Sequence, residues 1–283
     1  MARVLAISSQ VARGHVGLSA IVPALQSLGH EVIALPTILL SNHPGHPHVA
    51  GERIAPELLS RMLGALQDNG WLAGVDALLT GYMPSVVHVA FAAEAMARVR
   101  AHNPNALVLV DPVLGDHPKG LYIDAAAANA VRDVLVPQAT LLKLNAFELE
   151  WLARRRITDA LSVRALVDAL GYAGPAVVTS VPCAGKTLAN VLIAGGAVAA
   201  IACRVQRLDH VPHGTGDLLS ALLAGHTLRL GAQQVVFSEQ VLARAVAGVD
   251  LVVRASMAHD ELCLVAQLGN LATCAPLPLV AVD

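Results

Sequence analysis

Charged and aromatic side chains are scarce in this chain. Of its 283 residues, 14% are charged and 3% are aromatic, and the formal net charge at pH 7 is −2. Because the net charge is near zero and no stretch concentrates lysine or arginine beyond Arg154-Arg155-Arg156, the chain is not expected to bind nucleic acid. The 4 cysteines are widely spaced and form no CxxC pair, so they predict neither a zinc site nor disulfides. Reduced thiols in turn predict a cytoplasmic protein.

Long uninterrupted hydrophobic runs are also missing, although 55% of the residues are hydrophobic. The longest uncharged candidate, residues 77–93, is broken by glycine, proline, serine and histidine. It is also shorter than the ~20 residues that a membrane-spanning helix needs. The apolar run at residues 4–7 is too short for a signal peptide. We therefore expect no membrane segment.

Short apolar runs alternate with helical patterns along the chain. Strands are predicted at residues 4–7, 31–35, 77–80, 106–110, 141–142, 176–179 and 191–193. Helices are predicted at 19–28, 56–69, 91–102, from 146 onward and from 218 onward. Because the strands are continuously apolar, they predict an α/β fold whose parallel sheet is covered on both faces. No linker divides the chain, so we expect a single domain spanning residues 1–283.

Polar residues follow several of the predicted strands. In parallel sheets, ligands bind beyond the carboxyl ends of the strands, so these residues predict a site at one edge of the sheet. They are Ser8, Ser9, Gly81, Tyr82, Asp111, Asn145, Thr179 and Ser180.

Two common nucleotide-binding motifs are not found in this chain. The segment Gly185-Lys186-Thr187 resembles the end of a P-loop, but Ser180 stands where the first glycine is required, which favours an ordinary turn. No GxGxxG follows the first predicted strand, which argues against a dinucleotide-dependent dehydrogenase.

A Gly-Thr-Gly-Asp segment at residues 214–217 precedes a predicted helix. Its glycines allow a tight turn, and the free N–H groups at a helix start can bind phosphate. Such a loop would stabilise negative charge on a transferred phosphoryl group, and Asp217 could accept a proton from an attacking hydroxyl. The alternative is that Asp217 only caps the helix, and this segment alone does not separate the two.

Three motifs together resemble those of the ribokinase-like small-molecule kinases: Gly-Thr-Gly-Asp at 214–217, Asp-Pro-Val-Leu-Gly at 111–115 and Asn-x-x-Glu at 145–148. Within that superfamily the chain is most similar to the pyridoxal (vitamin B6) kinases. Further matches are Ser-Gln-Val at 9–11, Gly-His-Val-Gly at 14–17, Ser-Asn-His at 41–43, Thr-Gly-Tyr at 80–82 and Lys-Gly-Leu-Tyr at 119–122. The matches run in order through nearly the whole chain. The related hydroxymethylpyrimidine kinases lack the Ser-Asn-His loop, which separates them from the pyridoxal kinases.

The resemblance implies a ribokinase-like three-layer α/β/α sandwich with a mostly parallel central sheet. It also implies a homodimer and ATP-dependent phosphorylation of the 5′-hydroxymethyl group of pyridoxal or a related B6 vitamer. Asp217 would be the catalytic base in this reaction. The anion hole would consist of Gly214, Thr215 and Gly216.

The resemblance also assigns the ligand contacts. Asp111 and Glu148 would hold Mg²⁺, partly through water, because magnesium sheds its hydration shell reluctantly. For Asn145 and Glu148 the structural alternative is a capping pair at a helix start. The expected ATP-binding residues are Asp111, Lys143, Asn145, Glu148, Thr179, Ser180, Arg204 and Val205. The expected substrate-binding residues are Ser9, Gly17, His43, Pro44, Gly45, Tyr82 and Asp217.

The chain departs from the family pattern around the expected pyridine pocket and beside the phosphates. Pro44, Leu18 and Val49 replace a threonine, an asparagine and a tryptophan that are usual there, so the preferred vitamer stays open. Lys143 and Leu144 replace the residues that usually precede Asn-x-x-Glu. We hypothesise that the Lys143 ammonium occupies the space where relatives hold a monovalent cation.

Two alternatives to a pyridoxal kinase stay open. One is a kinase of the same fold that acts on pyridoxamine, a hydroxymethylpyrimidine or a sugar alcohol. The other is a non-catalytic B6-binding protein, although a pure binder has no need of a base at position 217. The three histidines at 43, 46 and 48 are separated by prolines and lack a completing ligand, so they predict a substrate-covering loop rather than a zinc site.

Overall fold

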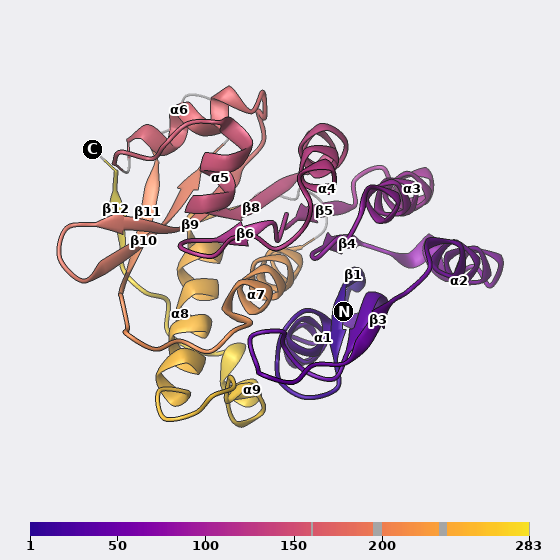
Figure 1. The fold of residues 1–283 in the computed structure, drawn as a ribbon, viewed down its shortest axis with the longest axis horizontal. Helices are drawn as coiled ribbons and strands as arrows, with labels where there is room; N and C mark the ends of the chain where they lie inside the picture. Colours follow the sequence, from indigo (N-terminus) through magenta and orange to yellow (C-terminus); the bar gives the residue numbers. More distant parts are fainter. Residues whose placement is uncertain (160, 195–199, 232–236, 283) are drawn as a thin grey trace.

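A ten-stranded sheet forms the centre of the computed structural model, which describes residues 1–159, 161–194, 200–231 and 237–282 (Figure 1). In spatial order its strands are β12 (Leu279–Ala281), β11 (Ile201–Gln206), β10 (Thr187–Ile193), β9 (Ala176–Cys183), β8 (Leu141–Asn145), β5 (Leu107–Val110), β4 (Ala77–Thr80), β1 (Arg3–Val11), β2 (Glu31–Leu40) and β3 (Gly51–Arg53). The strands from β9 to β2 run parallel, as predicted.

Antiparallel strands extend this parallel sheet at both ends. At one end β9, β10, β11 and β12 pair antiparallel, and at the other end β3 pairs antiparallel with β2. A short connection joins β9 to β10, and such connections make neighbouring strands antiparallel. Gly185, in the left-handed region with a φ of 71°, lies in that connection, which confirms the ordinary turn predicted there.

Helices cover both faces of the sheet, which gives the predicted three layers (Figure 1). One layer holds α2 (Pro56–Asp68), α3 (Val86–His102), α4 (Ala125–Ala130), α5 (Ala146–Ala153) and α6 (Ser162–Ala169). The other holds α1 (Leu18–Ser27), α7 (Thr215–Arg229), α8 (Glu239–Ala255) and α9 (Leu264–Leu271). Shorter elements are the hairpin of β6 (Gly115–Asp116) and β7 (Gly120–Leu121) and the helical turns η1 (Trp71–Gly74), η2 (Val131–Leu135) and η3 (Val136–Gln138).

The central strands are apolar throughout because each strand contributes to two cores. In β1, Leu5 and Ile7 pack in the core beneath α2 to α6, whereas Val4 and Ala6 pack in the core beneath α1 and α7 to α9. Successive side chains of a strand point to opposite faces, so a sheet with two covered faces needs apolar residues at every position. The continuous apolar runs in the sequence follow from this arrangement.

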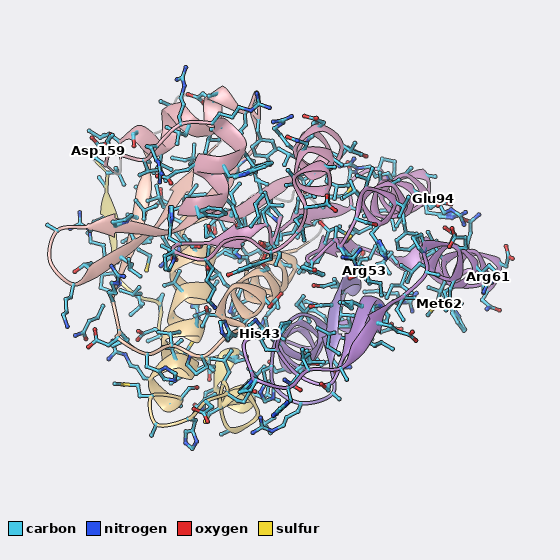
Figure 2. The ribbon with its side chains drawn as sticks, in the orientation of Figure 1. His43, Arg53, Arg61, Met62, Glu94 and Asp159 are labelled. Atoms are coloured by element: carbon cyan, nitrogen blue, oxygen red, sulfur yellow. The ribbon has the colours of Figure 1, made fainter. Side chains whose placement is uncertain are left out.

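Charged side chains lie mainly on the outside of the molecule. Figure 2 shows Arg61, Glu94 and Asp159 at its periphery, whereas His43 lies near its middle. None of the helices in the described ranges is long and apolar enough to span a bilayer.

Candidate active site

The carboxyl ends of the parallel strands open onto one large cavity of about 1010 Å³. This is the edge of the sheet at which the sequence placed its polar residues. The predicted residues that line the cavity are Ser9, His43, Pro44, Gly45, Tyr82, Asp111, Lys143, Asn145, Glu148, Thr179, Ser180, Val205, Gly214, Thr215, Gly216 and Asp217. Residues distant in the sequence are therefore brought together at one site.

The start of α7 forms one wall of this cavity. The helix begins at Thr215, directly after Gly214, whose φ of 101° lies in the left-handed region. A Cβ atom at Gly214 would lie 1.8 Å from the carbonyl oxygen of His15, so glycine is required here. The unpaired N–H groups and the positive end of the helix dipole face the cavity and can bind an anion.

Asp217 lies in the first turn of α7, half-buried at the cavity wall. Burial raises the pKa of its carboxyl group to about 6, and the nearby charge of Asp111 acts in the same direction. A hydrogen bond from the backbone N–H of Gly17 favours the ionised form and limits the rise. A carboxylate with a pKa near 6 is ionised at neutral pH and is basic enough to accept a proton from a hydroxyl group during its reaction.

Asp111 and Lys143 form a buried ion pair behind the anion-binding loop. Lys143 Nζ lies 2.8 Å from Asp111 Oδ2, and the same oxygen accepts a hydrogen bond from Ser220 Oγ at 2.7 Å. Burial alone would lower the pKa of Lys143, but the charges of Asp111 and Glu148 outweigh it and raise that pKa. The ammonium also lies close to the loop, because a Cβ atom at Gly216 would be 3.1 Å from Lys143 Nζ.

Asn145 and Glu148 form a capping box at the start of α5. The Asn145 side chain accepts a hydrogen bond from the backbone N–H of Glu148 at 2.9 Å, and Glu148 Oε2 accepts one from the backbone N–H of Asn145 at 2.7 Å. Glu148 Oε1 accepts a further bond from the backbone N–H of Leu114 at 2.9 Å. Burial and the charge of Asp111 raise the pKa of Glu148 to about 7. Asn145 and Glu148 therefore form the capping pair considered as the structural alternative, and both residues also line the cavity.

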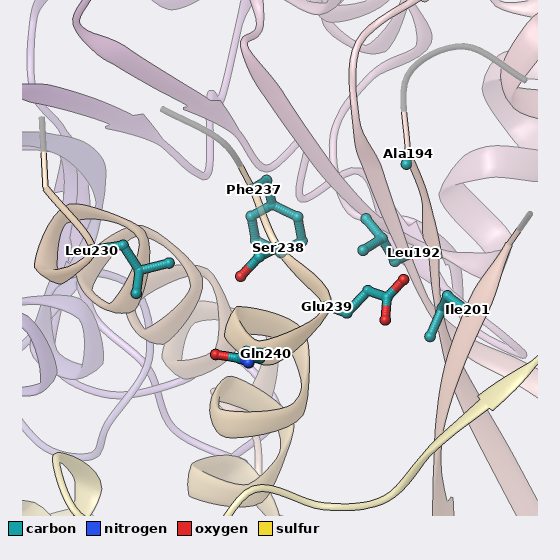
Figure 3. A pocket seen from close by; sticks show the side chains of 8 residues that line it. All are labelled: Leu192, Ala194, Ile201, Leu230, Phe237, Ser238, Glu239 and Gln240. Atoms are coloured by element: carbon teal, nitrogen blue, oxygen red, sulfur yellow. The ribbon is translucent and has the colours of Figure 1, made fainter. Parts of the chain in front are cut away.

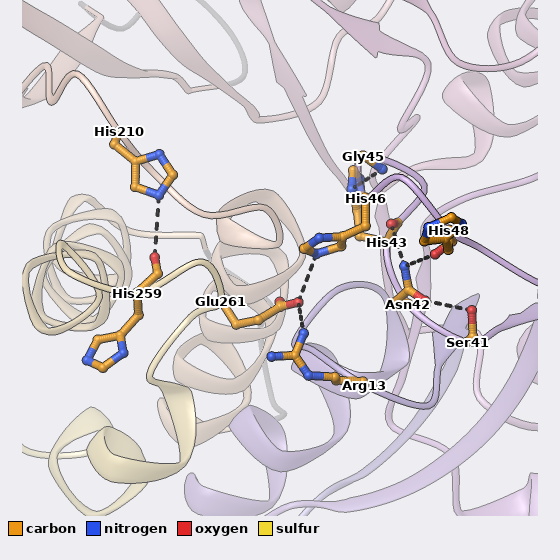
Figure 4. A network of polar contacts seen from close by, with 10 residues as sticks. All are labelled: Arg13, Ser41, Asn42, His43, Gly45, His46, His48, His210, His259 and Glu261. Carbon is orange, nitrogen blue, oxygen red and sulfur yellow. Dashed lines mark hydrogen bonds and ion pairs between the residues drawn. The ribbon is translucent and has the colours of Figure 1, made fainter.

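A loop covers the opposite side of the cavity, and we call residues 41–50 the His43 loop. The ring of His43 stacks on that of His213, with ring centroids 3.7 Å apart. The loop is also linked to the C-terminal part of the chain, because His46 Nε2 lies 3.2 Å from Glu261 Oε1 (Figure 4). Arg13 pairs with the same carboxylate oxygen at 3.4 Å. Residues of the His43 loop line the cavity, and the role predicted for the loop in covering a substrate stays a prediction.

Two of the predicted contact residues are not among those that line the cavity. Arg204 is exposed on β11, whereas its neighbour Val205 faces the cavity, because successive side chains of a strand point to opposite faces. The prediction that Arg204 contacts the nucleotide is therefore not supported. Gly17 is buried beneath the cavity and acts on the site through its N–H bond to Asp217 instead of lining it.

Sequence reasoning missed several residues of the site. His213 lines the cavity, and its place directly before the Gly-Thr-Gly-Asp segment could have indicated this. Val113 also lines the cavity, with a φ of 46° that is strained for a β-branched residue; strain of this kind is often found at functional sites. Ser220 had no local signal, because its partner Asp111 is 109 residues away in the sequence.

A second, smaller cavity of about 570 Å³ lies between β10, β11 and the start of α8 (Figure 3). Glu239 is the only titratable side chain among the described residues that line it. This hollow offers no arrangement of base and anion-binding groups comparable to that of the large cavity.

The donor set of the large cavity fits Mg²⁺ only in part. In the described ranges, no three His, Cys, Asp or Glu side chains are grouped so that they alone could hold a metal ion. Asp111 Oδ1 is nevertheless buried without a hydrogen-bond partner in those ranges. Magnesium commonly takes one or two protein carboxylates and completes its shell with water and substrate phosphates. One orphaned carboxylate oxygen beside an anion-binding loop is compatible with that mode.

Comparison with known proteins places this geometry in a class of small-molecule kinases. The family described as Phosphomethylpyrimidine kinase matches residues 19–240. A pyridoxal kinase PdxY from Leifsonia xyli subsp. xyli is 33% identical over 242 residues, which cover 84% of this chain and 86% of the relative. A pyridoxine/pyridoxal/pyridoxamine kinase from Bordetella avium is 38% identical over 231 residues, which cover 80% of this chain and 77% of the relative.

Solved structures show the same fold. Pyridoxal kinase from Entamoeba histolytica superposes with a TM-score of 0.91 at 22% identity over 100% of both chains. Pyridoxal kinase from Leishmania donovani, in complex with ADP and pyridoxamine, superposes with a TM-score of 0.90 at 23% identity, again over 100% of both chains. This chain belongs to the phosphomethylpyrimidine kinase family of the ribokinase-like superfamily and, within it, to the pyridoxal kinases.

Proposed function

We propose that this protein transfers the γ-phosphoryl group of ATP to the 5′-hydroxymethyl group of pyridoxal or a related B6 vitamer. The observation that carries the proposal is the place of Asp217, a carboxylate with a raised pKa beside the N–H groups at the start of α7. The relatives from Leifsonia xyli and Bordetella avium, named as kinases of B6 vitamers, support it.

In the proposed reaction Asp217 is the base. The hydroxyl oxygen of the vitamer bonds to the γ-phosphorus, the bond from that phosphorus to the bridging oxygen of ADP breaks, and the hydroxyl proton passes to Asp217. Backbone N–H groups of Gly214, Thr215 and Gly216 stabilise the charge on the transferred group. Catalysis of this kind depends on positioning and on charge stabilisation more than on covalent chemistry.

The nucleotide is proposed to bind between the start of α7 and the ends of β8 and β9. Thr179, Ser180 and Val205 line this part of the cavity. Asp111, through Oδ1, and Glu148, through water, would hold Mg²⁺, which neutralises charge on the phosphates when it is bound. The Lys143 ammonium supplies a fixed positive charge beside Gly216, close enough to contact a phosphate bound at the loop.

The vitamer is proposed to bind between Ser9, Tyr82 and the His43 loop. A hydroxyl group suits the polar edge of a pyridine ring, and a phenol ring can stack on its face. Of the three departures from the family pattern, Pro44 and Val49 line the cavity, whereas Leu18 is buried in the core beneath α1 and α7 to α9. Which vitamer is preferred is a question for measurement. Phosphorylation of a hydroxymethylpyrimidine is the second candidate, and the description of the matching family favours it.

A substrate panel tests these candidates directly. We expect the unmodified protein to consume ATP with pyridoxal, pyridoxine or pyridoxamine. Asp217→Asn should abolish this consumption, while the variant still binds ADP. Turnover of hydroxymethylpyrimidine alone would replace the proposed substrate. Tight vitamer binding without any turnover would favour the non-catalytic binding protein.

We further propose that the chain folds as one domain, forms a homodimer and is cytoplasmic. The continuous ten-stranded sheet supports a single domain, and the resemblance to pyridoxal kinases supports a homodimer. The four cysteines, which are free thiols, support a cytoplasmic location. Sedimentation of the purified protein tests the homodimer.

A further inference from the structure

The side chain of Ser220 connects the helix that carries the base to Asp111. Ser220 follows Asp217 by three residues on α7, so both side chains lie on one face of the helix. Serine and threonine inside a helix often bond a backbone carbonyl one turn back, as Thr227 on the same helix does with Leu223. Ser220 is fully buried and instead donates its hydrogen bond to Asp111 Oδ2 at 2.7 Å.

The two carboxylate oxygens of Asp111 have different surroundings. Oδ2 accepts hydrogen bonds from Ser220 and from Lys143, which approach from α7 and from β8. Oδ1 is buried and has no partner within the described ranges. A charged oxygen buried without a donor is costly, so this arrangement favours a cation at Oδ1.

Two donors from different elements hold a carboxylate in one orientation, whereas one donor does not. With Lys143 as the only partner, the carboxylate of Asp111 could rotate and offer either oxygen to the ammonium. The hydroxyl of Ser220 removes that freedom. The Asp111 side chain is thereby oriented before any ligand arrives, and such preorganisation lowers the cost of binding.

We propose that Ser220 is a positioning residue for phosphoryl transfer, which holds Asp111 so that Oδ2 binds Lys143 and Oδ1 is presented to the metal bound with ATP. The proposal rests on the proposed function, because it takes Asp111 as the residue that meets the metal. It concerns a residue for which neither a motif nor a spacing in the sequence predicts a role.

Calorimetric titration with ADP, in the absence and presence of Mg²⁺, tests this role without turnover. We expect Mg²⁺ to tighten ADP binding to the unmodified protein. In Ser220→Ala the increase in ADP affinity caused by Mg²⁺ should be about tenfold smaller, because a hydrogen bond to a charged group contributes on that scale. The affinity for ADP without metal should stay the same. The control is Thr227→Val, which removes another buried hydroxyl from α7 without touching Asp111 and should retain the full gain.

Ser220→Cys is nearly isosteric but donates only weakly, so it should reproduce the loss even if the alanine variant folds poorly. The proposal is overturned if both variants keep the full Mg²⁺-linked gain, if they lose metal-free and metal-linked affinity equally, or if Mg²⁺ does not affect ADP binding to the unmodified protein. A protein that phosphorylates no B6 vitamer would overturn the proposed function instead, and the titration would still test Ser220.

Discussion

The rings of His43 and His213 stack with centroids 3.7 Å apart and planes inclined by 20°. The stack joins the His43 loop to the residue that precedes the anion-binding loop, so it connects the two walls of the cavity. The backbone N–H of Gly45 donates to His43 Nδ1 at 2.9 Å, which leaves the ring proton on Nε2. Burial lowers the pKa of His43 to about 4 and also lowers the pKa of His213. Both rings are therefore neutral at pH 7 and do not repel each other.

Replacing His213 by alanine should weaken the binding of the vitamer. Without its stacking partner the His43 loop loses one of its contacts, and stacked rings of this kind contribute about 0.5–1.5 kcal/mol. We expect the KM for the vitamer to rise about three- to tenfold, with little change in the KM for ATP. Steady-state kinetics with each substrate varied in turn measures both constants. His213→Phe keeps an aromatic ring and should stay near the original value; equal loss in both variants would show that stacking is not the cause.

The rate should depend on pH through Asp217. Its pKa is raised to about 6, so the base is protonated below that pH and ionised above it. We expect kcat to rise with pH and to level off above about pH 7. The charge of Lys143 counteracts that rise in pKa, so Lys143→Met should move the acidic limb of the profile to higher pH. An acidic limb that stays in place in Lys143→Met would contradict this coupling.

The ammonium of Lys143 should make the enzyme independent of potassium. It is buried beside Asp111 and near Gly216, where it supplies a fixed positive charge. Lys143→Ala leaves buried carboxylates without their cation, so we expect a loss of about a hundredfold or more in kcat. Potassium should restore part of that loss by entering the vacated space, whereas choline chloride at the same ionic strength should not. Strong activation of the unmodified enzyme by potassium would count against the hypothesis.

The parts of the site that depend on local sequence could be predicted, and those that depend on distant contacts could not. Asp217 follows its glycines directly, and Asn145 caps the helix on which Glu148 is the third residue, so spacing alone brings each group together. The partners in the His43–His213 stack come from distant parts of the chain. No periodicity in the sequence reports such a pair, because only tertiary packing creates it.

Strand geometry explains why Arg204 does not line the cavity. The family resemblance assigned both Arg204 and Val205 to the nucleotide, and of the two only Val205 lines the cavity, so its contact with the nucleotide stays a prediction. Adjacent side chains within a strand point to opposite faces, so which side of β11 faces the cavity depends on how the strand lies in the sheet. The fold was more predictable, because the parallel strands are apolar on both faces. Among the antiparallel strands, β10 was predicted in part, whereas β3, β11 and β12 were not, since these strands are partly exposed and carry a weaker pattern.

The last prediction concerns stability in acid and the buried ring of His226 on α7. Its Nε2 atom has no partner within the described ranges, and burial, with Arg229 and Arg244 nearby, lowers its pKa from 6.5 to about 4. Between these two values the unfolded chain binds the proton and the folded chain does not, so the contribution of His226 to the free energy of unfolding falls as the pH drops from about 6.5 to about 4. The full effect is about 3 kcal/mol.

His226→Leu removes this titration, so its free energy of unfolding should lose about 3 kcal/mol less than that of the unmodified protein as the pH drops across that window. Urea denaturation at several pH values between 4 and 7 measures the slope. Thr227→Val changes the neighbouring buried side chain without removing a titratable group, so its slope should match that of the unmodified protein. Other groups also set the slope in both proteins. His30 and His43, whose pKa burial lowers, act in the same direction as His226, whereas the raised pKa values of Asp217 and Glu148 act in the opposite direction. The test is therefore the difference between the two slopes. An unchanged slope in His226→Leu would mean that this imidazole already carries its proton in the folded protein.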